Sequence, residues 1–267
     1  MTDTPPAPKP SDRPSSESLR EDLLWGDLRR LTAARIGLAR CGASLATAPL
    51  LDFRLSHSRA RDAVNEPLDR ARLSAALAGL SDPVLAVASA AATRTDYLMR
   101  PDLGRRLAAD AQAILAPHGG GYDVAFVIAD GLSARAVEAH APPVLARAIE
   151  TLRARGCRIA PLVVVRHGRV AIGDAVTTAL GADCAAILIG ERPGLSAADS
   201  MGAYLTYKPH PGTTDAHRNC ISNIRPEGLG YADAALKIAR MLGAMRTARF
   251  SGVRLKDDTG HLVDAGE

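Results

Sequence analysis

Residues 163–194 read VVVRHGRVAIGDAVTTALGADCAAILIGERPG, and this stretch decides the fold. Two apolar runs of strand type flank a turn and a short helical segment. The second run ends directly in Gly190, Glu191 and Arg192, which are followed by Pro193 and Gly194. A buried strand that ends in this way places charged groups at the carboxyl edge of a sheet, which is where open α/β proteins bind ligands. The sequence therefore predicts a ligand site at this edge.

Alternating strand and helix patterns continue on both sides of this stretch. Strands are expected at residues 123–129, 161–166 and 185–189, with a further strand at 204–207. Helices are expected at residues 134–155, 174–181 and 231–246, the first of them interrupted at Pro142 and Pro143. Strands that alternate with helices indicate a mostly parallel sheet covered on both faces. The expected fold class is therefore α/β, with a Rossmann-like sheet in residues 119–250.

Three glycines at positions 119–121 mark the expected start of this domain. Before them, residues 21–118 predict a smaller N-terminal helical region, with helices at 21–31, 50–64 and 100–115. Residues 1–20 are rich in proline and serine, which is typical of a disordered N-terminal tail. Residues 251–267 predict a polar C-terminal tail.

The composition bounds the class of protein. Apolar residues make up 47 % of the 267 residues, yet no apolar run approaches the roughly 18 residues of a membrane span. The net charge is +4, but no Lys/Arg tract is interleaved with aromatic residues, so we expect neither a nucleic acid nor a membrane partner. The four cysteines form no CxxC pair, and we expect no disulfide framework and no zinc site. The start of the chain lacks an apolar signal-peptide centre, and a cytoplasmic location is expected.

Three turns near the predicted sheet edge carry candidate ligand-binding residues. Glu191 is the strongest, because a charged residue at the end of a strand is poorly explained by packing and its carboxylate can accept hydrogen bonds from a ligand. The alternative is an ion pair with Arg192 that stiffens the loop. Val170 has backbone groups that can meet a polar ligand, although its spacing alone favours a tight turn in which it packs. Cys220 is better explained as a small residue that lines a pocket than as a catalytic thiolate.

Two further patterns bear on the chemistry. Residues 215–220 read DAHRNC, close to the Asp-x-His-x-x-Gly pattern of proteins in which histidine replaces the lower base of cobalamin. Position 220 is cysteine rather than glycine, so we do not assign His217 as a cobalt ligand. No catalytic or metal-ligating residue can be assigned, which indicates a binding subunit whose chemistry lies partly on another chain. His57, Arg59 and Arg61 on an early helix favour a surface that faces another subunit.

Seven segments carry a resemblance to a known family, and they are residues 32–42, 58–62, 97–107, 128–133, 165–170, 190–195 and 219–224. As a set and in this order they resemble the small subunit of ethanolamine ammonia-lyase, over about residues 25–245. The resemblance implies a lyase that depends on adenosylcobalamin and converts ethanolamine to acetaldehyde and ammonia by a radical mechanism. It also implies a large subunit, a TIM barrel that holds the substrate and most catalytic groups.

The same resemblance implies the site and the assembly. Val170, Glu191 and Cys220 match the family's cofactor-binding positions, on the side of a pocket that holds cobalamin with its own base on cobalt. The implied assembly is a hexamer of large–small pairs, often inside a bacterial microcompartment. The alternative function is that of a non-catalytic Rossmann-like module, either nucleotide-binding or regulatory. The sequence lacks the GxGxxG fingerprint of dinucleotide binding.

Overall fold

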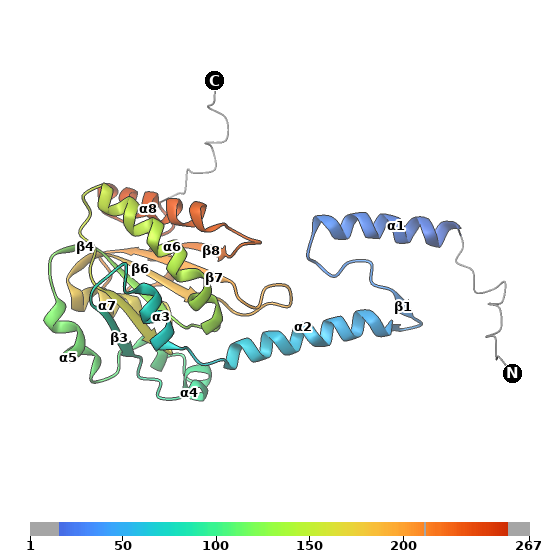
Figure 1. The fold of residues 1–267 in the computed structure, drawn as a ribbon, viewed down its shortest axis with the longest axis horizontal. Helices are drawn as coiled ribbons and strands as arrows, with labels where there is room; N and C mark the ends of the chain where they lie inside the picture. Colours follow the sequence, from blue (N-terminus) through green and yellow to red (C-terminus); the bar gives the residue numbers. More distant parts are fainter. Residues whose placement is uncertain (1–15, 211, 256–267) are drawn as a thin grey trace, which may run out of the picture. The chain divides into compact units, whose positions relative to one another are not determined.

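The computed structural model describes residues 16–210 and 212–255, with side chains from Leu24 onward. The chain divides into two compact units between His57 and Ser58, which are drawn in Figure 1 and described separately below. Among the described residues, no helix combines the length and the apolar character that a membrane crossing requires.

The first unit consists of two helices joined by a short hairpin. Its elements are α1 (Ser16–Leu31), β1 (Arg40–Cys41), β2 (Ser44–Leu45) and the first part of α2 (Thr47–Asn65). Gly37 adopts a φ of +54°, and a Cβ atom there would lie 2.3 Å from the ring of Trp25, so both the conformation and the space require glycine. Arg35 connects to α2 through Asp52 at 3.3 Å and Ser56 at 2.7 Å. We expected a disordered tail at residues 1–20. Residues 1–15 lie outside the described residues, and residues 16–20 are the first part of helix α1, which begins at Ser16.

The second unit is built on a six-stranded sheet with the order β3-β5-β4-β6-β7-β8. The first four strands in this order are parallel, and β7 and β8 are added in antiparallel register. The strands are β3 (Val84–Ala88), β4 (Tyr122–Ala129), β5 (Leu162–Arg166), β6 (Ala182–Gly190), β7 (Met201–Tyr207) and β8 (Asn219–Ile224). The structure thus confirms a mixed α/β fold with a mainly parallel sheet.

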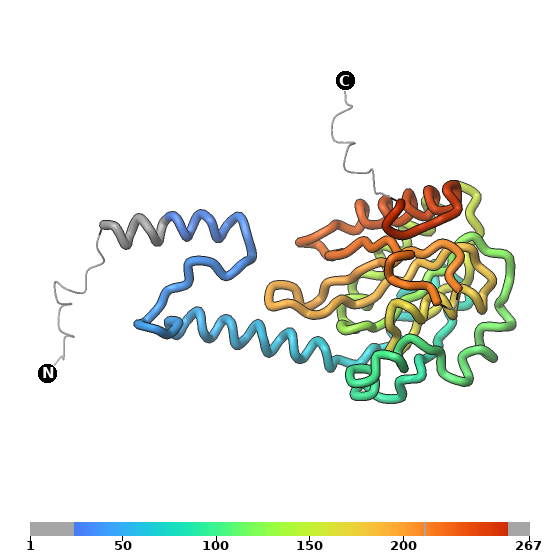
Figure 2. Tube along the Cα trace, turned by 180° about the vertical axis from the view of Figure 1, so that it is seen from behind, coloured from blue at the N-terminus to red at the C-terminus, as the bar shows by residue number. Residues whose placement is uncertain are grey.

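Alternate residues of each central strand pack into different layers. In β4, Phe126 and Ile128 pack under α3 (Arg70–Leu77), α6 (Ala134–Ala154) and α8 (Tyr231–Ala248). Val127 and Ala129 face the opposite layer, where α5 (Ala111–Leu115) and α7 (Ile172–Leu180) lie. Figures 1 and 2 show α6 and α8 side by side over the first face. The two-residue period of a strand thus produces two cores, one on each face of the sheet.

Some elements differ from the sequence expectations. Strand β3 joins the sheet from within residues 21–118, a region that we expected to be helical. The single helix expected at residues 100–115 is replaced by a 3₁₀ turn, η2 (Leu103–Arg105), and the short helix α5. Helix α6 runs through Pro142 and Pro143 without interruption. A proline inside a helix costs about 3 kcal/mol. Helix α6 also buries Leu145 and other apolar side chains against the sheet, and each large one contributes about 1.5–3 kcal/mol.

Candidate functional site

The carboxyl ends of β4, β5 and β6 meet at one edge of the sheet, and the turns that follow them border a cleft of about 480 Å³. Two of the three predicted binding residues, Val170 and Glu191, line this cleft. The complete lining is Tyr97, Leu132, Arg169, Val170, Ile189, Gly190, Glu191, Arg192 and Tyr204. The parallel part of the sheet thus brings together two residues that are 21 positions apart in the sequence (191 − 170).

Beneath the cleft, Asp130 joins the turns that follow β4 and β5. The residue is only 3 % exposed, and its carboxylate accepts a hydrogen bond from the N–H of Gly168 at 3.1 Å and lies 3.8 Å from Nη1 of Arg94. Burial raises the pKa of Asp130. The turn after β4 packs so closely on the end of β6 that a Cβ atom on Gly190 would lie 2.1 Å from the carbonyl oxygen of Ser133. This part of the cleft is therefore tightly packed, and position 190 requires glycine.

Glu191 is fixed through one of its two carboxylate oxygens. Its Oε2 accepts hydrogen bonds from the hydroxyl of Ser200 and from the N–H of Asn223 at 3.3 Å, and its own N–H donates to the carbonyl of Ser200 at 2.9 Å. Within the described chain, Oε1 accepts no hydrogen bond, and no ion pair joins Glu191 to Arg192. The alternative of a Glu–Arg ion pair is therefore not observed, and one carboxylate oxygen stays free to accept from a ligand.

Val170 both packs and lines the cleft. Its half-buried side chain lies against the core beneath α7, as the tight-turn alternative predicted. Its backbone N–H makes no hydrogen bond in the part of the chain that the structure describes. Val170 therefore presents a free donor as well as methyl groups close to the start of α7.

Cys220 lies beside the cleft and is not one of its lining residues. It sits on β8 directly opposite Tyr204 of β7, and Tyr204 lines the cleft. Burial raises the pKa of the Cys220 thiol, and the negative charge of Glu191 raises it further, while a hydrogen bond with Tyr204 opposes both. The sulfur is therefore kept protonated, which fits a neutral wall residue better than a thiolate nucleophile.

Sequence reasoning did not identify the aromatic and cationic side of the cleft. Tyr97, on α4 (Arg94–Met99), is 1 % exposed. The guanidinium carbons of Arg94 and Arg169 lie 4.7 Å and 4.5 Å from the centroid of its ring. Burial raises the pKa of Tyr97 to about 12, against the opposing effect of the two cations. Tyr97 comes from a short helix that precedes β4, so no spacing within the sheet region pointed to it. The only signal was its place in one of the segments that carry the family resemblance.

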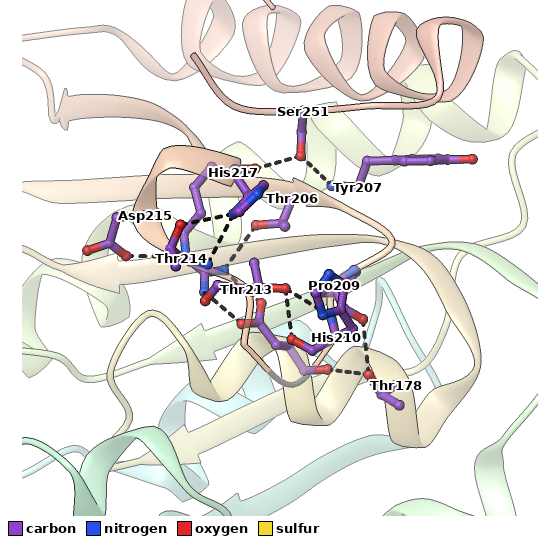
Figure 3. A network of polar contacts seen from close by, with 12 residues as sticks. Thr178, Thr206, Tyr207, Pro209, His210, Thr213, Thr214, Asp215, His217 and Ser251 are labelled. Carbon is purple, nitrogen blue, oxygen red and sulfur yellow. Dashed lines mark hydrogen bonds and ion pairs between the residues drawn. The ribbon is translucent and has the colours of Figure 1, made fainter. Parts of the chain in front are cut away.

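The segment that leads into β8 is held by a polar network (Figure 3). Arg218, whose side chain is 3 % exposed, donates to both carboxylate oxygens of Asp174 at 2.7 and 2.6 Å and to the hydroxyl of Thr206 at 3.1 Å. Nearby, Nδ1 of His217 lies 2.9 Å from the hydroxyl of Thr214 in a capping box. These contacts fix the start of β8 and thereby the position of Cys220. In the described ranges, no group of three or more His, Cys, Asp or Glu side chains could hold a metal ion.

Comparison with known proteins gives consistent matches. Residues 23–256 match the family model described as ethanolamine ammonia-lyase light chain (EutC). The chain is 52 % identical over 247 residues to the ethanolamine ammonia-lyase small subunit of Ralstonia nicotianae, covering 91 % of this chain and 92 % of that protein. It is 52 % identical over 238 residues to the protein of the same name from Azotobacter vinelandii, with 88 % of each chain covered. For Rhodopseudomonas palustris the identity is 51 % over 247 residues, with 92 % of each chain covered.

Proposed function

The chain belongs to the ethanolamine ammonia-lyase light-chain family, and we propose that its cleft forms one side of an adenosylcobalamin site that a large subunit completes. As a small subunit it acts in a two-subunit lyase. We further propose that the assembled enzyme converts ethanolamine to acetaldehyde and ammonia by a radical mechanism.

The cleft residues fit this cofactor chemically. Cobalamin has a broad, largely apolar ring with neutral amide side chains at its edge. The cleft offers apolar surface from Leu132, Val170 and Ile189, and the free Oε1 of Glu191 can accept from an amide N–H. At about 480 Å³ the cleft is open to solvent and holds only part of so large a molecule, which supports a shared site. The observation that carries the proposal is that Val170 and the half-occupied carboxylate of Glu191 meet in one cleft.

Each residue has a distinct proposed role. Glu191 orients the cofactor by accepting an amide hydrogen bond, while Ser200 and Asn223 hold its other oxygen in place. Val170 contacts the cofactor through its methyl groups or its free N–H. Tyr204 forms a wall of the cleft, with Cys220 beside it on β8. The raised pKa of Cys220 keeps a proton on its sulfur, so that this sulfur does not compete for cobalt. When bound, adenosylcobalamin supplies homolytic cleavage of its cobalt–carbon bond.

The remaining parts of the reaction are assigned to the large subunit. None of the residues that line the cleft forms a nucleophile–base pair, so we place the substrate and most catalytic groups on the partner. His57, Arg59 and Arg61 are exposed on α2, which supports the proposal that this surface faces a partner subunit. A hexamer of large–small pairs in the cytoplasm, inside a microcompartment where the host makes one, completes the proposal.

The test is reconstitution with the cognate large subunit. The small subunit alone should not deaminate ethanolamine, and the complex with adenosylcobalamin should. Glu191→Ala should weaken cobalamin binding to the complex by roughly tenfold, since it removes an acceptor that is charged. Arg105→Gln serves as the control, because Arg105 is exposed and lines a different cavity. Deamination by the isolated chain, or unchanged affinity in Glu191→Ala, would contradict the proposal.

A further inference from the structure

A second cavity lies along α7 and is separate from the cleft described above. Its volume is about 700 Å³, which is larger than that of the cleft, and the two share no lining residue. Its lining is Arg105, Arg106, Leu107, Gln112, Ala171, Asp174, Ala175, Thr178, Ala179, His210, Gly212 and Thr213. Small-molecule sites in proteins typically measure about 300–1,000 Å³, so this cavity has the size of a ligand site.

One part of the lining is apolar. Ala171, Ala175 and Ala179 recur every four residues, which places them along one face of α7 and the turn before it. Leu107 adds a larger apolar side chain. Because alanine side chains are small, they leave room above this face, and the cavity therefore offers an apolar surface to the body of a ligand.

The part of the lining that follows β7 is held by hydrogen bonds (Figure 3). The N–H of His210 donates to the hydroxyl of Thr213 at 2.9 Å, and the N–H of Thr213 donates to the carbonyl of His210 at 3.0 Å. On α7, the hydroxyl of Thr178 donates to the carbonyl of Asp174 at 2.8 Å. This side of the cavity is therefore preformed, which lowers the entropic cost of binding a ligand.

The charge of the cavity favours an anion. Asp174 is the one acid among its described lining residues, and both of its carboxylate oxygens accept hydrogen bonds from Arg218, at 2.7 and 2.6 Å. Arg105 forms no ion pair or hydrogen bond with any residue that the structure describes, and neither does the side-chain amide of Gln112. A cation and a neutral donor thus stay available, and the acid in the lining is already paired.

The neighbouring acid outside the lining does not neutralise the arginines. Arg106 lies 3.3 Å from Asp102, but the two oxygens of Asp102 also accept from Arg100, each at 2.9 Å. Three guanidinium groups, including that of Arg105, share one carboxylate, which leaves a net charge of +2 (3 − 1) at this end. A phosphate monoester carries a charge of about −1.5 to −2 at pH 7 and matches the fork of donors that arginine presents.

We propose that this cavity binds a small organic phosphate, with the phosphate on Arg105 and Arg106 and an apolar body along the alanines of α7. A nucleoside monophosphate has this composition and serves as the probe. The inference goes beyond the proposed function because it adds a second ligand, and it depends neither on the first cleft nor on a partner subunit.

The test is calorimetric titration of the full chain, without corrinoid and without a large subunit, by AMP, adenosine and inorganic phosphate. AMP should bind at least tenfold more tightly than either part alone. Arg105→Gln should weaken AMP by roughly tenfold, since it removes a charged donor to the phosphate. Arg155→Gln is the matched control, because Arg155 is exposed and lines another cavity, and it should leave AMP affinity unchanged.

A second variant tests the apolar part of the site. Ala175→Leu keeps a good helix former on α7 and fills the space above the alanines, so it should weaken AMP and leave inorganic phosphate unchanged. The thermal unfolding midpoint of each variant shows whether the chain still folds, and Arg105→Gln, a change at an exposed residue, is the decisive one.

Three outcomes would each overturn the inference. They are a wild-type chain that binds no AMP, equal losses in Arg105→Gln and Arg155→Gln, and binding of inorganic phosphate as tight as that of AMP. All three leave the proposed function standing, because the titration contains no corrinoid. Conversely, a complex that binds AMP but no cobalamin would contradict the proposed function alone.

Discussion

His140 connects two helices to the loop that carries Ser200, and its removal should loosen that loop. The side chain is 3 % exposed. Its Nδ1 lies 2.9 Å from the hydroxyl of Tyr231 on α8, and its Nε2 lies 2.8 Å from the carbonyl of Asp199. Ser200, the next residue, donates its hydroxyl to Glu191. His140 therefore positions the Glu191 carboxylate through the backbone of the loop.

The size of the effect follows from these two hydrogen bonds. Each contributes about 0.5–1.5 kcal/mol net, so His140→Leu, which keeps much of the buried volume, should lower the free energy of unfolding by about 1–3 kcal/mol. Tyr231→Phe is the matched control, because it removes only the bond to α8 and should cost about 0.5–1.5 kcal/mol. Urea unfolding of the full chain measures both values.

Hydrogen exchange distinguishes a positioning role from a general loss of stability. In His140→Leu, amides of residues 191–200 should exchange faster than in the wild type, and more than in Tyr231→Phe, and cobalamin affinity of the complex should fall. Equal exchange in the two variants, or wild-type exchange and affinity in His140→Leu, would refute the reasoning.

Two other predictions concern β8 and its approach. Arg218→Met should destabilise the chain by about 3–5 kcal/mol, because it leaves the largely buried carboxylate of Asp174 without its cation, and adding Asp174→Leu should recover part of the loss in urea unfolding. Alkylation of Cys220 by iodoacetamide, followed by mass spectrometry against pH, should have its midpoint above pH 9.0, since burial and the charge of Glu191 raise the pKa of the thiol. Glu191→Gln should move that midpoint down, and a wild-type midpoint below 9.0 would contradict this account.

The central sheet was predictable because its strands are buried on both faces. Continuous apolar runs followed by glycine or charged turns locate β4, β5 and β6, and the rule for the carboxyl edge then places Val170 and Glu191 together. The outer strands gave weaker signals. In β8 the sequence NCISNI is mostly polar, with only Ile221 and Ile224 buried, and β3 lies among short alanine-rich segments.

The missed part of the site depends on contacts between distant parts of the sequence. Tyr97 reaches the cleft from α4, and its stacking with Arg169 joins residues 72 positions apart. No local period carries that information. Likewise, Pro142 and Pro143 predicted a break in the helix, because the free-energy cost of a proline inside a helix is a local property of the sequence. The burial of α6 against the sheet, which offsets this cost, depends on the tertiary structure.

The antiparallel addition of β7 and β8 has a consequence for the order in which the cleft is completed during synthesis. β7 starts and β8 ends at the edge of the sheet where β6 ends. Of the residues that bind the Glu191 carboxylate, Asn223 is therefore the last to be synthesised. A ribosome adds about 5–20 residues per second from the N-terminus. The nascent chain therefore passes through a period in which the parallel strands have emerged and the Glu191 carboxylate is still unrestrained. Any ligand whose binding requires a fixed Glu191 carboxylate can therefore bind only after nearly the whole polypeptide has left the exit tunnel.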